Sequence, residues 1–176
     1  MTSIDEIRTP KMLLVRMQAS DLAELEHMYA DPIVMATLGG VRSKEAVAKY
    51  LDTHLAHWQE YGYGFWTVRD PLTGQFAGRG GLRHMIVDGR PELEVGYGFV
   101  REYWGRGWAT ELARESVRVA FEELKRPDLV CFTLPTNLAS KRVMQKVGFV
   151  YEKDIVHADL PHVFYRQLAP TNRTRR

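Results

Sequence analysis

The segment Val100-Arg101-Glu102-Tyr103-Trp104-Gly105-Arg106-Gly107-Trp108-Ala109-Thr110 joins a predicted strand to the start of an amphipathic helix. Its glycines let the backbone approach an anion closely and turn several amides toward it. A helix start also exposes unpaired N–H groups and positive partial charge. The segment therefore predicts a phosphate or pyrophosphate site to which Arg101 and Arg106 add charge, with a ligand-free basic turn as the alternative. It has neither the ending of a Walker loop nor the spacing of a dinucleotide-binding motif.

The elements on either side of this turn follow from periodicity. Downstream, apolar residues recur every three or four positions over 109–124, which predicts a helix. Upstream, alternation over 92–100 predicts a strand, and Asp88-Gly89 predicts the hairpin turn before it. The same criteria predict further strands over 12–17, 65–69, 76–82, 129–133, 150–156 and 163–168, and helices over 20–29, 43–61 and 137–147. This order is typical of a mixed α/β (α+β) domain rather than a doubly wound one.

Composition restricts the class of protein. The chain has 176 residues, 45% of them hydrophobic and 26% charged, which predicts a single domain over 12–168 with an N-terminal extension over 1–11 and a basic tail over 169–176. A net charge of +2 does not favour a nucleic-acid partner, and no apolar run is long enough to span a membrane. Cys131 is the single cysteine, so we expect a reducing, cytoplasmic location. His54 and His57 lack a third ligand, so we expect no metal site.

Two blocks of sequence carry a resemblance to a known family. Residues 104–109 end in Gly107-Trp108-Ala109, which fits the end of a Gln/Arg-x-x-Gly-x-Gly/Ala pattern, although Trp104 stands at its first position. Asn137-Leu138-Ala139-Ser140 is followed by Lys146-Val147-Gly148-Phe149. Together the blocks resemble the GNAT superfamily of N-acetyltransferases, in the branch of ribosomal-protein N-terminal (alanine/serine) acetyltransferases. The resemblance implies a mixed, mostly antiparallel seven-stranded sheet, splayed at its centre and flanked by about four helices.

The resemblance also implies acetyl-CoA as co-substrate, held by main-chain amides. The pantetheine arm would lie on Phe99, Val100 and Arg101. The pyrophosphate would lie on the amides of Arg106, Gly107, Trp108, Ala109 and Thr110. Asn137 and Ser140 would face the thioester and Arg142 would reach the nucleotide, with a plain helix-capping role as the alternative for Asn137.

The predicted strand over 92–100 places Glu94, Gly96 and Gly98 on one face, and we interpret the two glycines as room for a groove. An acceptor amine with a pKa near 10 is protonated at neutral pH and must lose a proton before it attacks a thioester. We predict Glu94 as the base, with Glu92 as a second choice and an ion pair to Arg83 or Arg101 as the structural alternative. A main-chain N–H near Phe99 or Val100 would hold the oxyanion.

The leaving thiolate needs an acid or a hydrogen-bond donor near the thioester. Many members of the family use a tyrosine on the helix after the asparagine, but Met144 stands there in this chain. We therefore predict Ser140 in this role, either as the acid or as a hydrogen-bond donor to the sulfur.

The acceptor is an amine whose identity the sequence leaves open. By resemblance, Tyr61, Tyr63 and Trp66 are predicted to line its pocket, with a core role as the alternative. His84, near a strand end, is predicted to contact the acceptor, with an ordinary surface histidine as the alternative. We expect direct acetyl transfer to a protein or peptide N-terminal amine. The alternatives are a small amine (polyamine, amino acid or aminoglycoside) and a non-catalytic acyl-CoA-binding domain. An acidic pocket wall would favour a polycation and a shallow groove a peptide terminus. Acyl-chain preference and oligomeric state, a homodimer included, are left open.

Overall fold

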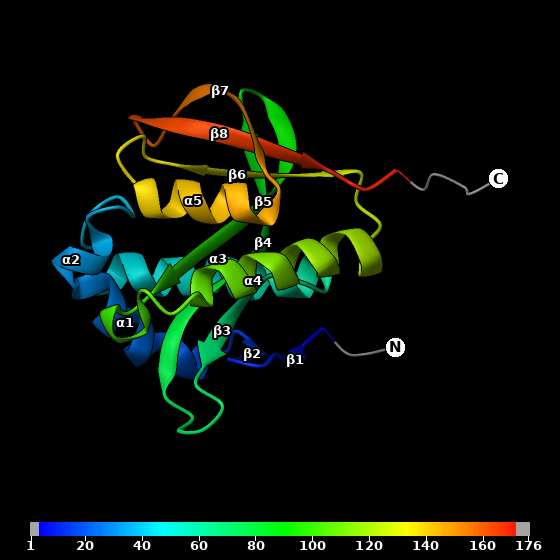
Figure 1. Ribbon diagram of the computed structural model, residues 1–176. Helices are drawn as coiled ribbons and strands as arrows, with labels where there is room; N and C mark the ends of the chain where they lie inside the picture. The colour runs from blue at the N-terminus through cyan, green and yellow to red at the C-terminus, as the bar shows by residue number, and fades with distance from the viewer. Residues whose placement is uncertain (1–3, 172–176) are drawn as a thin grey trace.

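The structure, a computed structural model, describes residues 4–171 and is built around one eight-stranded sheet (Figure 1). The strands run in the spatial order β1-β2-β3-β4-β5-β6-β8-β7, and β5–β6 is the one parallel pair among the described strands. Their bounds are β1 Glu6–Arg8, β2 Leu13–Arg16, β3 Phe65–Arg69, β4 Phe76–Val87, β5 Arg90–Phe99, β6 Asp128–Thr133, β7 Val150–His157 and β8 Leu160–Leu168. Most of the predicted basic tail lies outside the described residues.

The predicted number of strands, seven, is wrong by one. The additional strand is β1, in the segment predicted as an N-terminal extension, and it pairs with β2 in the register Glu6↔Val15. A three-residue edge strand with one apolar residue, Ile7, has too little alternation to be recognised from sequence.

In the described part of the chain five α-helices cover the sheet, where about four were predicted. They are α1 Leu22–Ala30, α2 Pro32–Met35, α3 Lys44–Tyr61, α4 Trp108–Arg118 and α5 Leu138–Val147. The short α2 was not predicted, because its four residues are too few for a helical period and Pro32 is more typical of the end of a helix than of its interior. The Asp31 carboxylate accepts from the amides of Ile33 and Val34, and proline is tolerated in the first turn.

The helices lie on both faces of the sheet, so the domain has three layers (Figure 1). On one face α4 and α5 bury residues such as Leu112 and Met144 in the larger core. On the other, α1, α2 and α3 form a second core that includes Met28, Leu51 and the β3 residue Phe65. A buried side chain of this kind contributes about 1.5–3 kcal/mol to the free energy of unfolding.

The longest helix, α3, begins and ends where the sequence predicts. Ser43 accepts a hydrogen bond from the amide of Ala46 at 3.2 Å, and Gly62 ends the helix in the left-handed conformation (φ 72°). These caps fix the face that α3 presents to β3 and β4. Between residues 4 and 171, none of the helices has the length and apolar character needed to cross a bilayer.

Candidate active site

The centre of the sheet opens between β5 and β6. These parallel strands share one paired position, Glu94↔Val130, whereas β4 and β5 pair from Gly78↔Phe99 to Val87↔Arg90. Beyond Glu94, the edge of β5 therefore has no paired strand beside it. The splay implied by the family resemblance is present, and it lies between the two blocks of sequence that carry the resemblance.

The pairing of β5 with β4 decides which amides face this opening. Val100 donates its N–H to the Ala77 carbonyl at 2.9 Å. Because main-chain groups alternate sides along a strand, the N–H groups of Tyr97 and Phe99 point away from β4, toward β6. The predicted contact through the amide of Val100 is therefore wrong, since that amide is already bonded. The amide of Phe99 faces the opening, and its contact with the cofactor stays a prediction.

The turn between β5 and α4 is exposed from Trp104 to Gly107. Gly105 and Gly107 have positive φ angles of 70° and 76°, and an added Cβ at Gly105 would meet no atom within 4 Å. Gly107 precedes α4 without any side-chain cap, so the first amides of α4 have no partner from the cap residue. The turn is thus exposed to solvent, and the Lys11 side chain lies beside it, because a Cβ added at Gly107 would come within 2.9 Å of Lys11 Nζ.

Cationic side chains lie around this turn, and one of them, Lys11, was not predicted from the sequence. Lys11 donates from Nζ to the Arg106 carbonyl at 2.8 Å and from its amide to Glu111 at 3.0 Å. Arg101 pairs with Asp31 at 2.9 Å, so its charge is partly neutralised. Lys11 lies 95 residues from Arg106 in sequence, and no local pattern indicates the contact.

The start of α5 lies across the opening from β5. Asn137 caps α5 by accepting from the amide of Ser140 at 3.1 Å, and its amide nitrogen donates to Thr133 at 3.0 Å. The capping alternative for Asn137 is therefore present, and it leaves the predicted thioester contact untested. The hydroxyls of Ser140 and Tyr97 lie 2.9 Å apart. Burial raises the pKa of the Tyr97 hydroxyl well above its usual value, so this group stays protonated at neutral pH.

Glu94 occupies the opposite face of β5. Its side chain is 5% exposed, and its Oε2 accepts from Nε of Arg83, its direct cross-strand partner on β4. Oε1 accepts no hydrogen bond from the described residues. The second choice of base, Glu92, lies in a separate ion cluster on Arg166.

The interpretation of the glycines beside Glu94 is wrong. A Cβ at Gly96 would lie 2.6 Å from the ring of Phe65, and one at Gly98 would lie 3.0 Å from Met28. The glycines make room for side chains of the second core rather than for a groove. The accessible space on this face lies further along β4, beside Arg83.

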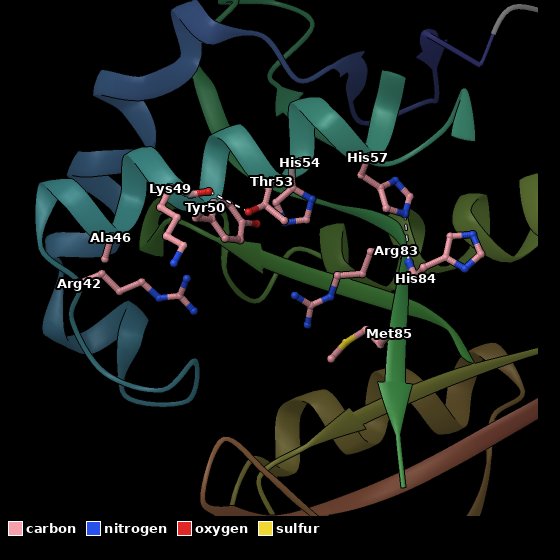
Figure 2. A pocket seen from close by; sticks show the side chains of 10 residues that line it. All are labelled: Arg42, Ala46, Lys49, Tyr50, Thr53, His54, His57, Arg83, His84 and Met85. Atoms are coloured by element: carbon pink, nitrogen blue, oxygen red, sulfur yellow. Dashed lines mark hydrogen bonds between the residues drawn. The ribbon is translucent and has the colours of Figure 1, made fainter. Parts of the chain in front are cut away.

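That space is a cavity of about 360 Å³ between α3 and β4 (Figure 2). Its lining is strongly basic and contains no carboxylate. The lining residues are Arg42, Ala46, Lys49, Tyr50, Thr53, His54, His57, Arg83, His84 and Met85. Its positively charged lining suits a small polar or anionic group.

Of the residues predicted to line an acceptor pocket, His84 does so directly. Tyr61 and Tyr63 pack around it, with ring centroids 4.2 and 5.8 Å from the His84 ring. Trp66 is fully buried in the larger core and donates to the Ile4 carbonyl at 2.8 Å. Trp66 therefore does not line this cavity, and the prediction is corrected to the alternative core role.

Two buried polar groups in the cavity wall have no hydrogen-bond partner among the described residues, the Tyr50 hydroxyl and His54 Nδ1. Burial lowers the pKa of His54 to about 2, so its ring is neutral at physiological pH. His57 is neutral as well, because its Nε2 accepts from the amide of His84 at 3.0 Å. Its Nδ1 then donates to the Tyr63 carbonyl at 2.9 Å.

Other chemistries find little support. Cys131 is buried, and burial raises the pKa of its thiol, which makes a thiolate nucleophile unfavourable. Within residues 4–171, no three metal-binding side chains are grouped as a metal site would require.

Comparisons with known proteins agree with this geometry. A family model described as an acetyltransferase (GNAT) domain matches residues 11–150. The uncharacterized protein YkkB of Bacillus subtilis is 29% identical over 168 residues, which cover 95% of this chain and 98% of that protein. The crystal structure of an acetyltransferase from Agrobacterium tumefaciens superimposes with a TM-score of 0.83 at 26% identity, over 95% of this chain and 96% of that one.

A third similarity concerns the fold alone. RimL, a ribosomal L7/L12 alpha-N-protein acetyltransferase solved in complex with coenzyme A, has a TM-score of 0.77 at 16% identity, over 93% of this chain and 98% of that one. The family model covers most of the chain and includes β5, the glycine turn and α5. The chain belongs to the GNAT family of acetyl-CoA-dependent N-acetyltransferases.

Proposed function

We propose that this enzyme acetylates the N-terminal amine of a peptide or the amine of a free amino acid, by direct attack on acetyl-CoA in the opening between β5 and β6. One observation carries the proposal. The opening lies between a glycine turn with open amides and a cavity whose wall adjoins Glu94. A thioester held from the first side meets an amine that enters from the second.

On the cofactor side, the first amides of α4 bind the diphosphate, and Arg106 and Lys11 add positive charge. The free edge of β5 offers the N–H groups of Tyr97 and Phe99 to the pantetheine arm. One of these amides also stabilises the oxyanion that forms when the amine attacks the carbonyl carbon.

On the acceptor side, Glu94 removes the proton of the ammonium group, directly or through a water molecule, through its free Oε1. Such assistance contributes roughly 10²–10⁴-fold to the rate. Glu94 and Tyr97 lie on opposite faces of β5 because they are three positions apart. The amine therefore loses its proton on one face of β5, and the leaving thiolate receives a proton from the other face.

After the C–S bond breaks, the thiolate of coenzyme A takes a proton. In this proposal the Tyr97–Ser140 hydroxyl pair supplies it, with Ser140 toward the sulfur and Tyr97 behind it, and the 2.9 Å separation of the two hydroxyls supports the proposal. This refines the predicted role of Ser140, because a second hydroxyl compensates for the tyrosine that Met144 replaces. A thiol with a pKa near 8.5 leaves easily, so the required help is modest.

The cavity also favours some acceptors over others. Its basic lining repels polyamines and aminoglycosides, which are polycations. The likeness to RimL concerns the fold, and we carry the protein α-amine of its name over to this chain only as part of the proposal. A volume of about 360 Å³ accommodates an amino acid or the first residue or two of a peptide.

The test is release of free thiol from acetyl-CoA in the presence of amino acids and short peptides, for wild type and Glu94→Gln. We expect turnover with some acceptors and a loss of roughly 10²–10⁴-fold in kcat for the variant. Stabilisation by acetyl-CoA should be equal in the two proteins, since Glu94 does not bind the cofactor. Stabilisation without turnover on any amine would instead support the non-catalytic alternative.

A further inference from the structure

The cavity between α3 and β4 has an excess of positive charge that the protein itself does not neutralise. Arg42, Lys49 and Arg83 line it, and none of the ten lining residues is acidic. In Figure 2, Arg42 and Lys49 extend into the space from one side and Arg83 from the other. Three cationic side chains from separate positions therefore converge on one hollow.

A fourth cation lies directly beneath them. Arg79 is 7% exposed, donates from Nε to the Tyr29 hydroxyl at 2.9 Å, and makes no ion pair with any carboxylate between residues 4 and 171. Its guanidinium lies 5.7 Å from the ring of Tyr50, which also lines the cavity. Arg42 lies 5.4 Å from the same ring and has no carboxylate partner in the described part of the chain either. Glu94, on Arg83, is the one acidic group paired within this cluster.

Solvation alone accounts poorly for this arrangement. Arg42 and Lys49 are exposed and water can solvate them, but Arg79 is buried and Arg83 is 30% exposed. A buried charge without a counter-ion is costly. The unpaired Tyr50 hydroxyl and His54 Nδ1 lie in the same wall. An anionic group in the cavity would neutralise part of this positive charge.

The position of Arg83 relates this anion to the reaction. Its Nε holds Glu94, while the rest of its planar guanidinium remains available to the cavity. Guanidinium groups bind carboxylates through paired, geometrically specific hydrogen bonds. A carboxylate bound between Arg42 and Arg83 would place an amine a few bonds away close to the proposed base.

We propose that this cavity binds a carboxylate of the acceptor, so that the enzyme selects primary amines that carry a carboxylate within a few bonds of the nitrogen. The inference rests on the proposed function for its catalytic meaning, but the anion site itself does not. The carboxylate has two sources, the α-carboxylate of a free amino acid or an acidic side chain at the start of a peptide. Both present the same chemistry to Arg42, Lys49 and Arg83.

The first experiment compares matched acceptors by thiol release. Alanine is tested against alaninamide, which differ only in the α-carboxylate, and the peptide Asp-Ala-Ala-amide against Asn-Ala-Ala-amide, which differ only in the side-chain carboxylate. We expect kcat/KM at least tenfold higher for the carboxylate member of one pair, and the pair that responds identifies the source. Equal values within every active pair, or faster acetylation of spermidine, would overturn the inference.

The second experiment uses variants. Arg42→Gln and Lys49→Gln should raise KM for the preferred acceptor severalfold and reduce the discrimination between carboxylate and amide, with KM for acetyl-CoA unchanged. Lys44→Gln is the matched control, because Lys44 lies on the same helix but does not line this cavity. Equal discrimination in all three variants and wild type would contradict the inference.

A third measurement needs no turnover. Succinate should raise the melting temperature of the wild-type chain more than succinamide does at equal ionic strength, and Arg42→Gln should remove the difference. If acetyl-CoA stabilises the protein and neutral amines are acetylated but succinate has no effect, the anion site is refuted and the proposed function stands. If succinate stabilises and no amine is acetylated, the proposed function fails and the anion site stands.

Discussion

The hydroxyl pair Tyr97–Ser140 predicts a measurable coupling between a strand and a helix that flank the reaction centre. Three variants test it: Tyr97→Phe, Ser140→Ala and the double variant. The two oxygens are 2.9 Å apart, an ordinary hydrogen-bond length, so their bond contributes about 0.5–1.5 kcal/mol to the free energy of unfolding. Each single variant also leaves the other hydroxyl without this partner. The stability losses of the two single variants should therefore add up to more than the loss in the double variant.

Unfolding in urea gives the coupling energy, and steady-state thiol release gives the catalytic effect. We expect a coupling of about 1 kcal/mol and a fall in kcat for Tyr97→Phe at or below the low end of the roughly 10²–10⁴-fold range, since thiolate is a good leaving group. Because burial raises the pKa of Tyr97, wild-type kcat should not fall between pH 7 and 9 through loss of this proton. Additive stability losses together with an unchanged kcat would refute the proposed proton route.

Three further predictions concern stability and cofactor binding. Burial lowers the pKa of His54 to about 2, so at mildly acidic pH the unfolded state binds a proton there that the folded state does not. The contribution of His54 to the free energy of unfolding is therefore fully present above pH 6.5 and is lost as the pH falls. The loss between pH 6.5 and 5 is about 2 kcal/mol, and urea unfolding of His54→Phe should show a smaller slope; an equal slope would contradict this. Gly107→Ala should cost about 1–2 kcal/mol, because φ is 76°, and weaken acetyl-CoA binding in calorimetry, whereas undiminished affinity would exclude a close approach there. Arg166→Met leaves the buried carboxylate of Glu92 unpaired. The free energy of unfolding in urea should fall by about 3 kcal/mol while acetyl-CoA affinity stays unchanged. A loss of under about 1 kcal/mol would show that the ion cluster contributes little to stability.

Local signals predicted most of the fold. The helix α3 has a serine cap, a terminal glycine and regular apolar spacing, and its predicted and observed bounds agree to one residue. Strand β3 was predicted with its observed bounds, 65–69. The elements that the sequence did not predict were either very short or began at a residue that is also typical of a helix end. Strand β1 is stabilised by pairing with β2 rather than by its own pattern, and Pro32 both ends α1 and starts α2.

The site was predicted where chemistry follows local sequence and missed where it depends on distant contacts. The glycine turn and the cap at Asn137 are local, and both are present. Val100 and Gly96 were misjudged because their surroundings are set by β4 and by Phe65, which lie outside any local window.

The basic cavity depends on residues from three separate segments. Arg42 precedes α3, Lys49 lies on α3, and Arg83 lies on β4 with the buried Arg79. Only the alternation of β4, which places Arg79 and Arg83 on one face, could have indicated a cluster there.

Hydrogen exchange of the backbone with and without saturating acetyl-CoA tests the central claim most directly. If the amides at the start of α4 bind the diphosphate, the peptide covering residues 105–111 should exchange markedly more slowly in the presence of acetyl-CoA. Unchanged exchange in this peptide, at a concentration where acetyl-CoA stabilises the protein, would contradict the account.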